Sequence, residues 1–238
     1  MKVQLFIPCF VDQLYPQTAF NMVKVLEKAG VEVAYNEEQT CCGQPAFNAG
    51  FRNEAREVCT KFLKDFDGTD YIVAPSASCV GFVRNYYSTL FDNSSLHNEV
   101  RDMQKRIFEF SSFLVNVLNV VDVGASLYGK ATYHDSCAGL RECRIKEEPR
   151  KLLSRVKGLD VLEMNDVETC CGFGGSFAVK FESISIAMAD QKVNNALQTG
   201  ADYIISTDLS CLMHLDGYIR HKGHPIRTMH IADVLANF

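Results

Sequence analysis

Short apolar runs alternate with amphipathic segments along the chain. Residues 3–8, which are mostly apolar, and residues 131–134 are bounded by polar or glycine residues, which is typical of strands. Residues 16–29 carry apolar side chains at helical spacing and are followed by Gly30, a common helix stop. The chain is therefore predicted to begin with a strand followed by a helix.

The same alternation continues in two matched series. We expect strands at 31–35 and 161–164, helices at 53–66 and 183–199, and then strands at 70–75 and 201–206. Strands that alternate with helices form βαβ units and a mainly parallel sheet. The predicted fold class is α/β, with two tandem βαβ-type repeats related by pseudo-twofold symmetry.

Residues 94–129 interrupt this repetition. Their apolar side chains recur at helical spacing, at Val100, Met103, Ile107, Phe110, Leu114 and Val117. We therefore expect a first repeat at 1–93, a helical connector at 94–129 and a second repeat at 130–238. The last part of the chain, 226–238, is expected to add an edge strand and a short helix.

Cysteines mark both repeats at matching positions. Cys-Cys-Gly occurs at 41–43 and again at 170–172, with one cysteine upstream and one downstream of each doublet. The first set is Cys9, Cys41, Cys42 and Cys79, and the second is Cys137, Cys170, Cys171 and Cys211. The second set is the first displaced by 128, 129, 129 and 132 residues. Four displacements this similar indicate a duplicated module.

Composition and charge narrow the class of protein. A chain of 238 residues that is 47% hydrophobic and 22% charged is globular. Its net charge of −5 and its scattered basic residues argue against a nucleic-acid or anionic-membrane partner. The apolar run at 3–10 is too short for a signal peptide, and the chain contains no stretch typical of a membrane span. We therefore expect a cytoplasmic protein whose thiols are reduced.

The eight matched cysteines predict two metal sites. In a reducing compartment, clustered cysteines favour metal binding or redox chemistry over structural disulfides. Each repeat offers four thiols, as many as an iron–sulfur cluster or a structural zinc ion needs, just past the carboxyl ends of strands. Gly43 and Gly172 allow the turn that brings both cysteines of a doublet to one centre. Burial of the cysteines as small apolar side chains, or a disulfide within each doublet, remain alternatives.

Several other residues have weaker interpretations. Cys59 is predicted to be a core thiol, and Cys143, which has no counterpart in the first repeat, is predicted to be structural or spare. His134 and Asp135 precede Cys137, so a proton-handling or supporting role beside the second centre competes with a purely structural role. His214 is expected to be solvated. The chain lacks the common nucleotide, phosphate and hydrolase motifs, and no catalytic residue is predicted.

The cysteine pattern resembles that of the cysteine-rich CCG-domain family over nearly the whole chain. That family includes the B subunit of heterodisulfide reductase and iron–sulfur subunits of glycolate oxidase and anaerobic glycerol-3-phosphate dehydrogenase. The segments at 40–45 (Thr-Cys-Cys-Gly-Gln-Pro) and 134–137 (His-Asp-Ser-Cys) are most similar to members that serve L-lactate utilisation. The resemblance implies a multi-protein system that oxidises lactate to pyruvate, with a ferredoxin-like iron–sulfur subunit and a third small subunit as partners.

The sequence departs from the family pattern at one position of each repeat. Where the family has the first cysteine of a Cys-x-x-Cys pair, this chain has Ser76 and Asp208. The five-cysteine sites that hold unusual clusters in heterodisulfide reductase therefore cannot form. Four ligands per repeat remain, enough for a cubane 4Fe–4S cluster or for zinc, and zinc is described in one copy in some relatives.

Two functions of different classes follow from these patterns. With the resemblance, the leading hypothesis is an iron–sulfur subunit of a multi-protein L-lactate dehydrogenase system that relays electrons through one or two cysteine-bound clusters. The alternative is a zinc-stabilised scaffold subunit with no redox step of its own. Catalysis by low-pKa thiols ranks last because it requires an exposed Cys-x-x-Cys-like pair, which the sequence lacks.

Overall fold

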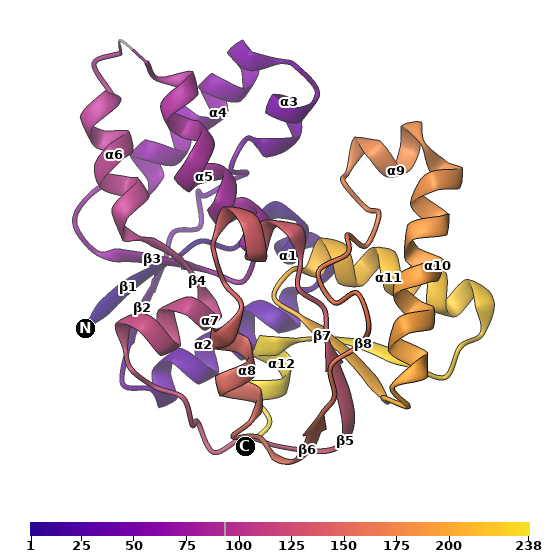
Figure 1. Ribbon diagram of the computed structural model, residues 1–238. Coiled ribbons are helices and arrows are strands. Elements are labelled where there is room, and N and C mark those ends of the chain that lie inside the picture. The colour runs from indigo at the N-terminus through magenta and orange to yellow at the C-terminus, as the bar shows by residue number, and fades with distance from the viewer. Residues whose placement is uncertain (93) are drawn as a thin grey trace.

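The computed structural model describes residues 1–92 and 94–238 and contains two four-stranded sheets whose paired strands are all parallel (Figure 1). The first sheet has the order β2-β1-β3-β4 and comprises β1 (Lys2–Leu5), β2 (Glu32–Tyr35), β3 (Tyr71–Ala74) and β4 (Ile107–Glu109). The second has the order β6-β5-β7-β8 and comprises β5 (Ser126–Tyr133), β6 (Lys157–Val161), β7 (Tyr203–Ser206) and β8 (Arg227–His230). The matching order confirms an α/β fold made of two similar halves.

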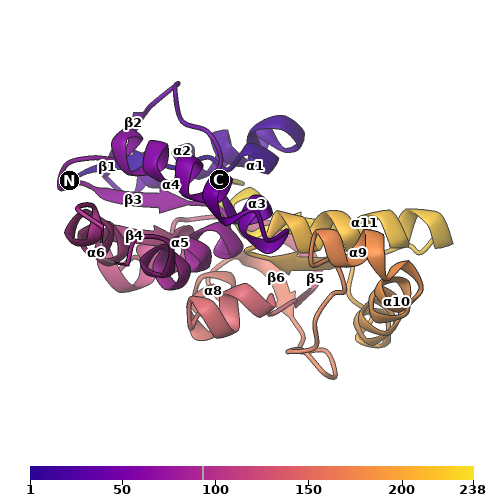
Figure 2. The same cartoon turned by 90° about the horizontal axis from the view of Figure 1, so that it is seen from above.

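Helices connect the strands in both halves. The first half contains α1 (Cys9–Leu14), α2 (Pro16–Lys28), α3 (Gln44–Asn48), α4 (Arg52–Asp65), α5 (Ala77–Leu90), α6 (His97–Arg106), α7 (Phe110–Ser112) and the π-helix η1 (Phe113–Val117). The second contains the π-helix η2 (Ala138–Glu142), α8 (Glu147–Leu153), α9 (Ser176–Lys180), α10 (Glu182–Gln198), α11 (Leu209–Lys222) and α12 (Ile231–Leu235). Figure 2 shows the two halves side by side. Among the described residues, no helix combines the length and the apolar character needed to cross a membrane.

Two predicted elements differ from the structure. The 94–129 segment is not helical throughout, because β4 follows α6 and pairs with β3, with Ile107 opposite Ile72. Apolar residues at Ile107 and Phe110 fit the helical period, but Ile107 and Glu109 are both buried, as alternating residues of an edge strand can be. The strand predicted at 161–164 lies earlier, at Lys157–Val161. The predicted boundary at residue 93 lies outside the described residues.

One of two hydrophobic clusters spans both halves, and the other lies mostly in the first half. Buried residues of α12 belong to the same apolar cluster as Met22, Val25 and Leu26 of α2, and Figure 1 shows these two helices together. Polar contacts fix this junction, because Asp233 of α12 accepts hydrogen bonds from Thr18 Oγ1 (3.0 Å) and Asn21 Nδ2 (2.8 Å). The edge strand and short helix expected at the end of the chain are confirmed as β8 and α12.

Candidate metal centres

The first cysteine set meets at the carboxyl edge of the first sheet. Cys9 begins α1 shortly after β1, Cys41 and Cys42 lie between β2 and α3, and Cys79 is in the first turn of α5 after β3. Parallel strands bring these three connections to one edge. The thiols interact in a chain, with side-chain hydrogen bonds between Cys9 and Cys41, between Cys41 and Cys42, and between Cys42 and Cys79. The structure therefore brings together all four cysteines of the first set.

The second set repeats this arrangement. Cys137 follows β5 and precedes η2, Cys170 and Cys171 lie between β6 and α9, and Cys211 is in the first turn of α11 after β7. Side-chain hydrogen bonds join Cys137 to Cys170, Cys170 to Cys171, and Cys171 to Cys211. All ten cysteines are free thiols, so the vicinal disulfides do not form in this structure.

One cysteine of each set is disposed to be a thiolate. Hydrogen bonds with Cys42 and Cys9 lower the pKa of Cys41 to about 3, and the backbone N–H of Gly43 donates to its sulfur at 3.4 Å. Hydrogen bonds with Cys137 and Cys171 lower the pKa of Cys170 to about 2, and its sulfur accepts an equivalent bond from Gly172 at 3.4 Å. Because metals bind the thiolate form, the first cysteine of each doublet is prepared as a ligand.

The glycine after each doublet is required by the fold. Gly43 and Gly172 have φ angles of +91° and +93°, in the left-handed region that glycine favours. A Cβ atom at Gly43 would lie 2.9 Å from Cys59 Sγ, and one at Gly172 would lie 2.6 Å from the carbonyl oxygen of Ser185. Any larger residue would displace the doublet from the helix behind it.

Different side chains hold the two doublet loops in place. In the first half, Gln39 accepts a hydrogen bond from Ile7 N (2.7 Å) and donates to the carbonyl of Leu5 (3.0 Å), which ties the loop to the end of β1. In the second half, the buried Lys192 donates to the carbonyls of Asp166 (2.7 Å) and Val167 (3.0 Å). Sequence reasoning missed both residues. The signal for Lys192 was a lysine at the spacing of the buried positions of α10.

Ser76 and Asp208, the two positions at which the sequence departs from the expected pattern, meet where the halves touch. Each is the N-cap of its helix, α5 or α11, and the two form an isolated antiparallel bridge. The buried Asp208 carboxylate accepts hydrogen bonds from Ser78 N (2.9 Å) and from Ser210 Oγ (2.6 Å). Both positions therefore cap helices and join the halves at their pseudo-twofold contact.

The two remaining cysteines are structural. Cys59 is fully buried and its sulfur donates to the carbonyl of Cys42 at 3.4 Å, which supports the doublet from behind. Cys143 is buried and donates to the carbonyl of Ala77 at 3.3 Å, across the junction of the halves. Burial raises the pKa of each thiol to about 12, so neither is a ready thiolate. The core-thiol prediction for Cys59 is confirmed.

The acidic residue beside the second set has a positioning role. Asp135 is buried and forms a two-point pair with Arg150, with N···O distances of 3.0 and 2.9 Å. Arg150 also donates to Glu163 at 2.6 Å. This network anchors the segment before Cys137 to the segment after β6.

The two histidines near the second set differ in surroundings. His134 is fully buried, and a ring nitrogen of His134 and the sulfurs of Cys171 and Cys211 all lie within 4.8 Å of one another. His214 lies outside this group, and the expectation that it is solvated is wrong. It is half-buried, with Nε2 3.2 Å from Ser185 Oγ and its ring 6.0 Å from that of Phe173.

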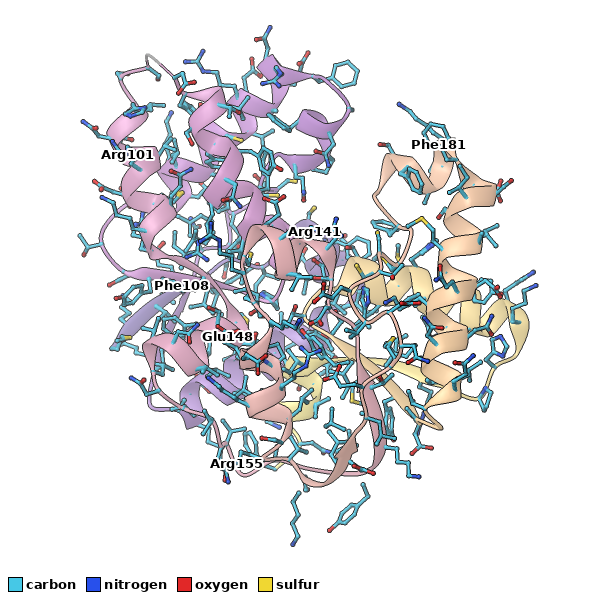
Figure 3. The ribbon with its side chains drawn as sticks, viewed as in Figure 1. Arg101, Phe108, Arg141, Glu148, Arg155 and Phe181 are labelled. Atoms are coloured by element: carbon cyan, nitrogen blue, oxygen red, sulfur yellow. The ribbon has the colours of Figure 1, made fainter. Side chains whose placement is uncertain are left out.

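Solvent reaches the two centres to different degrees. In the first set Cys9 is exposed, Cys41 and Cys79 are partly exposed and Cys42 is buried. In the second set Cys171 and Cys211 are both buried. An open depression of about 720 Å³ beside Cys170 is lined by residues 164–170 and by Arg141 of η2, which is labelled in Figure 3. The second centre is the more enclosed one, and this depression reaches it beside Cys170.

Both halves match one family model, described as a cysteine-rich domain, at residues 3–84 and 131–216. The chain therefore belongs to the cysteine-rich CCG-domain family and carries two copies of the domain. It is 44% identical over 235 residues to lactate utilization protein A of Halalkalibacterium halodurans, covering 99% of this chain and 96% of that protein. It is 42% identical to lactate utilization protein A of Geobacillus kaustophilus, covering 99% and 98%.

A solved structure shares the fold. A hypothetical protein from Helicobacter pylori matches with a TM-score of 0.62 and 12% sequence identity over 98% of this chain. The chain spans about half of that protein, 48% of its length. At this identity the likeness supports the fold alone.

Proposed function

We propose that the protein is an iron–sulfur redox subunit of a multi-protein system that oxidises L-lactate to pyruvate. The observation that carries the proposal is the duplicated cysteine tetrad at the carboxyl edge of each sheet. The names of the full-length relatives from Halalkalibacterium halodurans and Geobacillus kaustophilus support lactate utilisation as the process.

The residues present fit an iron–sulfur cluster in each half. Cys9, Cys41, Cys42 and Cys79 would hold one cluster, and Cys137, Cys170, Cys171 and Cys211 would hold the other. When bound, a 4Fe–4S cluster supplies reversible one-electron chemistry. The first cysteine of each doublet, Cys41 or Cys170, has a lowered pKa, and the N–H group of Gly43 or Gly172 donates to its sulfur, an interaction that favours a bound anionic cofactor.

The exposure of the first set suggests how the protein works with its partners. Because Cys9 is exposed and Cys41 is partly exposed, the first centre lies close enough to the surface to exchange electrons with another subunit. We propose that this subunit is a ferredoxin-like iron–sulfur protein and that a third small subunit completes the system. The 2-hydroxy acid would bind in the assembled complex.

Metal analysis of an oxygen-free preparation tests the proposal. Purification without oxygen should give a brown protein with similar amounts of iron and sulfide and a paramagnetic signal after reduction. Reduction should be reversible on titration with a mediator. A colourless protein that holds zinc alone, even after reconstitution with iron and sulfide, would overturn the redox function.

One observation favours a second candidate, a zinc-stabilised scaffold. Nitrogen and sulfur donors lie together at His134, Cys171 and Cys211, and such mixed sets are typical of structural zinc. Structural zinc contributes directly to folding free energy, so Cys171→Ser should then unfold the second half. Under the redox proposal, the same variant should remain folded and lose turnover in the assembled complex.

A further inference from the structure

His134 occupies an unusual position for a buried histidine. Its backbone N–H continues the sheet by donating to the carbonyl of Ile205 at 2.8 Å, and its side chain is completely buried. Among the residues that the structure describes, neither Nδ1 nor Nε2 has a hydrogen-bond partner. Buried polar atoms are nearly always paired, so an orphaned imidazole requires an explanation.

The orphaned ring faces the second cysteine set. One ring nitrogen lies within 4.8 Å of the sulfurs of Cys171 and Cys211, and both of those cysteines are buried. Because neither ring nitrogen has a hydrogen-bond partner among the described residues, a nitrogen lone pair is available to a metal at this place. Neutral imidazole nitrogen is a good ligand for iron and zinc.

The first half contains no equivalent donor. Phe6 stands three residues before Cys9, as His134 stands three residues before Cys137. The backbone position is the same, because Phe6 N donates to the carbonyl of Val73 at 3.0 Å on the matching strand β3. The Phe6 ring packs edge-on against Phe62 with a centroid distance of 4.8 Å. The donor is thus a feature of the second half and not a requirement of the fold.

The helix residue that accompanies Phe6 or His134 behind the cysteines also differs between the halves. Gly43 lies against Ala55 and Val58 of α4, and Gly172 lies against Ser185 and Met188 of α10, which aligns the two helices with an offset of 130 residues. This offset places Lys192 where the first half has Phe62. An aromatic pair behind the first set is therefore replaced by an imidazole and an ammonium group behind the second.

We propose that His134 is a nitrogen ligand of the second metal centre, so that this centre is bound by cysteine and histidine while the first is bound by cysteine alone. The inference rests on the two-centre function proposed above. It makes His134 one of four protein ligands, beside Cys171 and Cys211, so that it replaces one of the other two cysteines of the set, Cys137 or Cys170. It assigns no role to the other five histidines of the chain.

Pulsed EPR of the reduced protein tests this ligand directly. Protein would be prepared with ¹⁴N- or ¹⁵N-histidine, as wild type, as His134→Phe, which copies the first half, and as the control His214→Gln. We expect a strong histidine nitrogen coupling in wild type and in His214→Gln, and its loss in His134→Phe. A wild-type spectrum unchanged by the isotope, or a coupling retained in His134→Phe, would overturn the proposal.

A cobalt measurement separates this inference from the redox function. Co²⁺ added to the apoprotein reports nitrogen and sulfur ligation by its absorption spectrum, whether or not iron binds. His134→Phe should weaken Co²⁺ binding to the second centre at least about tenfold and should alter only that spectrum. Should His134→Phe not fold, His134→Gln and the wild-type isotope comparison take its place. Unchanged cobalt affinity and spectrum would contradict histidine ligation, whereas absence of iron alone would contradict only the redox function.

Discussion

The residues packed behind the two cysteine tetrads differ, although the strands of the two sheets have the same order. Behind the first lie Phe6 and Phe62, whose rings pack edge to face, with Phe66 beside them. Behind the second lie the buried His134 and Lys192. Duplication has kept the thiol positions and changed their surroundings. Because nearby charge and polarity set cluster potentials, clusters bound in the two halves, as proposed above, would differ in potential.

A second matched pair, away from the cysteine tetrads, shows the same divergence. Glu109 ends β4 opposite Ala74, and His230 ends β8 opposite Ser206, so the two residues occupy equivalent places. Each side chain caps the following helix, by accepting from Ser112 N or from Ala232 N. Burial raises the pKa of Glu109 to about 7 and lowers the pKa of His230, which favours the neutral form of each. An acidic and a basic side chain at equivalent positions of the two halves are thus both favoured in their neutral forms.

The largest expected effect comes from removing one doublet ligand in each half. Cys42 and Cys171 are matched, since each side chain is 2% exposed. Cys42→Ser and Cys171→Ser should each remove about half of the iron and leave the cluster of the other half intact, because the tetrads use separate ligands. Iron analysis and EPR of both variants provide the measurement.

The same two variants compare the stability of the centres in air. The first centre includes the exposed Cys9, so the protein that retains only that centre, Cys171→Ser, should bleach faster than Cys42→Ser. Loss of all iron from either variant, or faster bleaching of Cys42→Ser, would contradict independent centres with unequal access.

The next largest effect is a change in the pH dependence of folding. Because the pKa of Glu109 rises to about 7 on folding, its contribution to stability is present in acid and is lost as the pH rises through 7. A shift of this size corresponds to roughly 3 kcal/mol. Glu109→Gln, which cannot ionise, should be more stable than wild type at pH 8 by up to that amount and similar at pH 5. Urea unfolding at both pH values measures the difference.

His230 provides a control whose contribution to stability has the opposite pH dependence. Its pKa is lowered on folding by burial, so its contribution is present above its ordinary pKa and is lost as the pH falls below that value. His230→Gln should therefore flatten the acid side of the stability profile and leave the alkaline side unchanged. Identical profiles for the two variants would show that these residues do not control the pH dependence.

A smaller effect is expected at Lys192. Its positive charge lies near Cys170 and Cys171 and favours the more negative, reduced form of a bound cluster. Lys192→Met should lower the midpoint potential of the second centre by about 60 mV, which is about 1.4 kcal/mol for one electron. The matched control Phe62→Met should leave the first potential close to its wild-type value. Redox titration followed by EPR measures both centres, and equal shifts in the two variants would exclude a charge effect.

The smallest effect concerns the contact that joins the halves. Asp233→Ala removes the hydrogen bonds from Thr18 and Asn21 and should destabilise the protein by about 1 kcal/mol. Asp216→Ala removes only an ion pair with the exposed Arg220 within α11, and its effect should be smaller still. Urea midpoints of the two variants provide the comparison, and equal values would indicate that the junction adds no stability of its own.

Much of the architecture could be predicted from local sequence patterns, but the contacts between the halves could not. Apolar periodicity and cysteine spacing predicted most strands, the long helices and the eight clustered thiols. Periodicity did not reveal the three-residue edge strand β4, because Ile107 in the strand and Phe110 just after it also fit the spacing of a helix. The contact of Ser78 with Asp208 joins residues 130 positions apart, and no local pattern specifies such a pair. Lys192 was overlooked because its two carbonyl acceptors lie in a loop whose path depends on the completed fold.

The position of α12 has a consequence for the order in which the halves can fold. Ile231, Ala232, Val234 and Leu235 are buried in the same cluster as the inner face of α2, although α2 is made much earlier in the chain. The inner face of α2 therefore cannot complete its packing before α12 has been made. Cys42 lies in the other cluster, which contains no residue of α12. We expect a nascent chain arrested before residue 231 to leave α2 uncovered while the first tetrad can already pack.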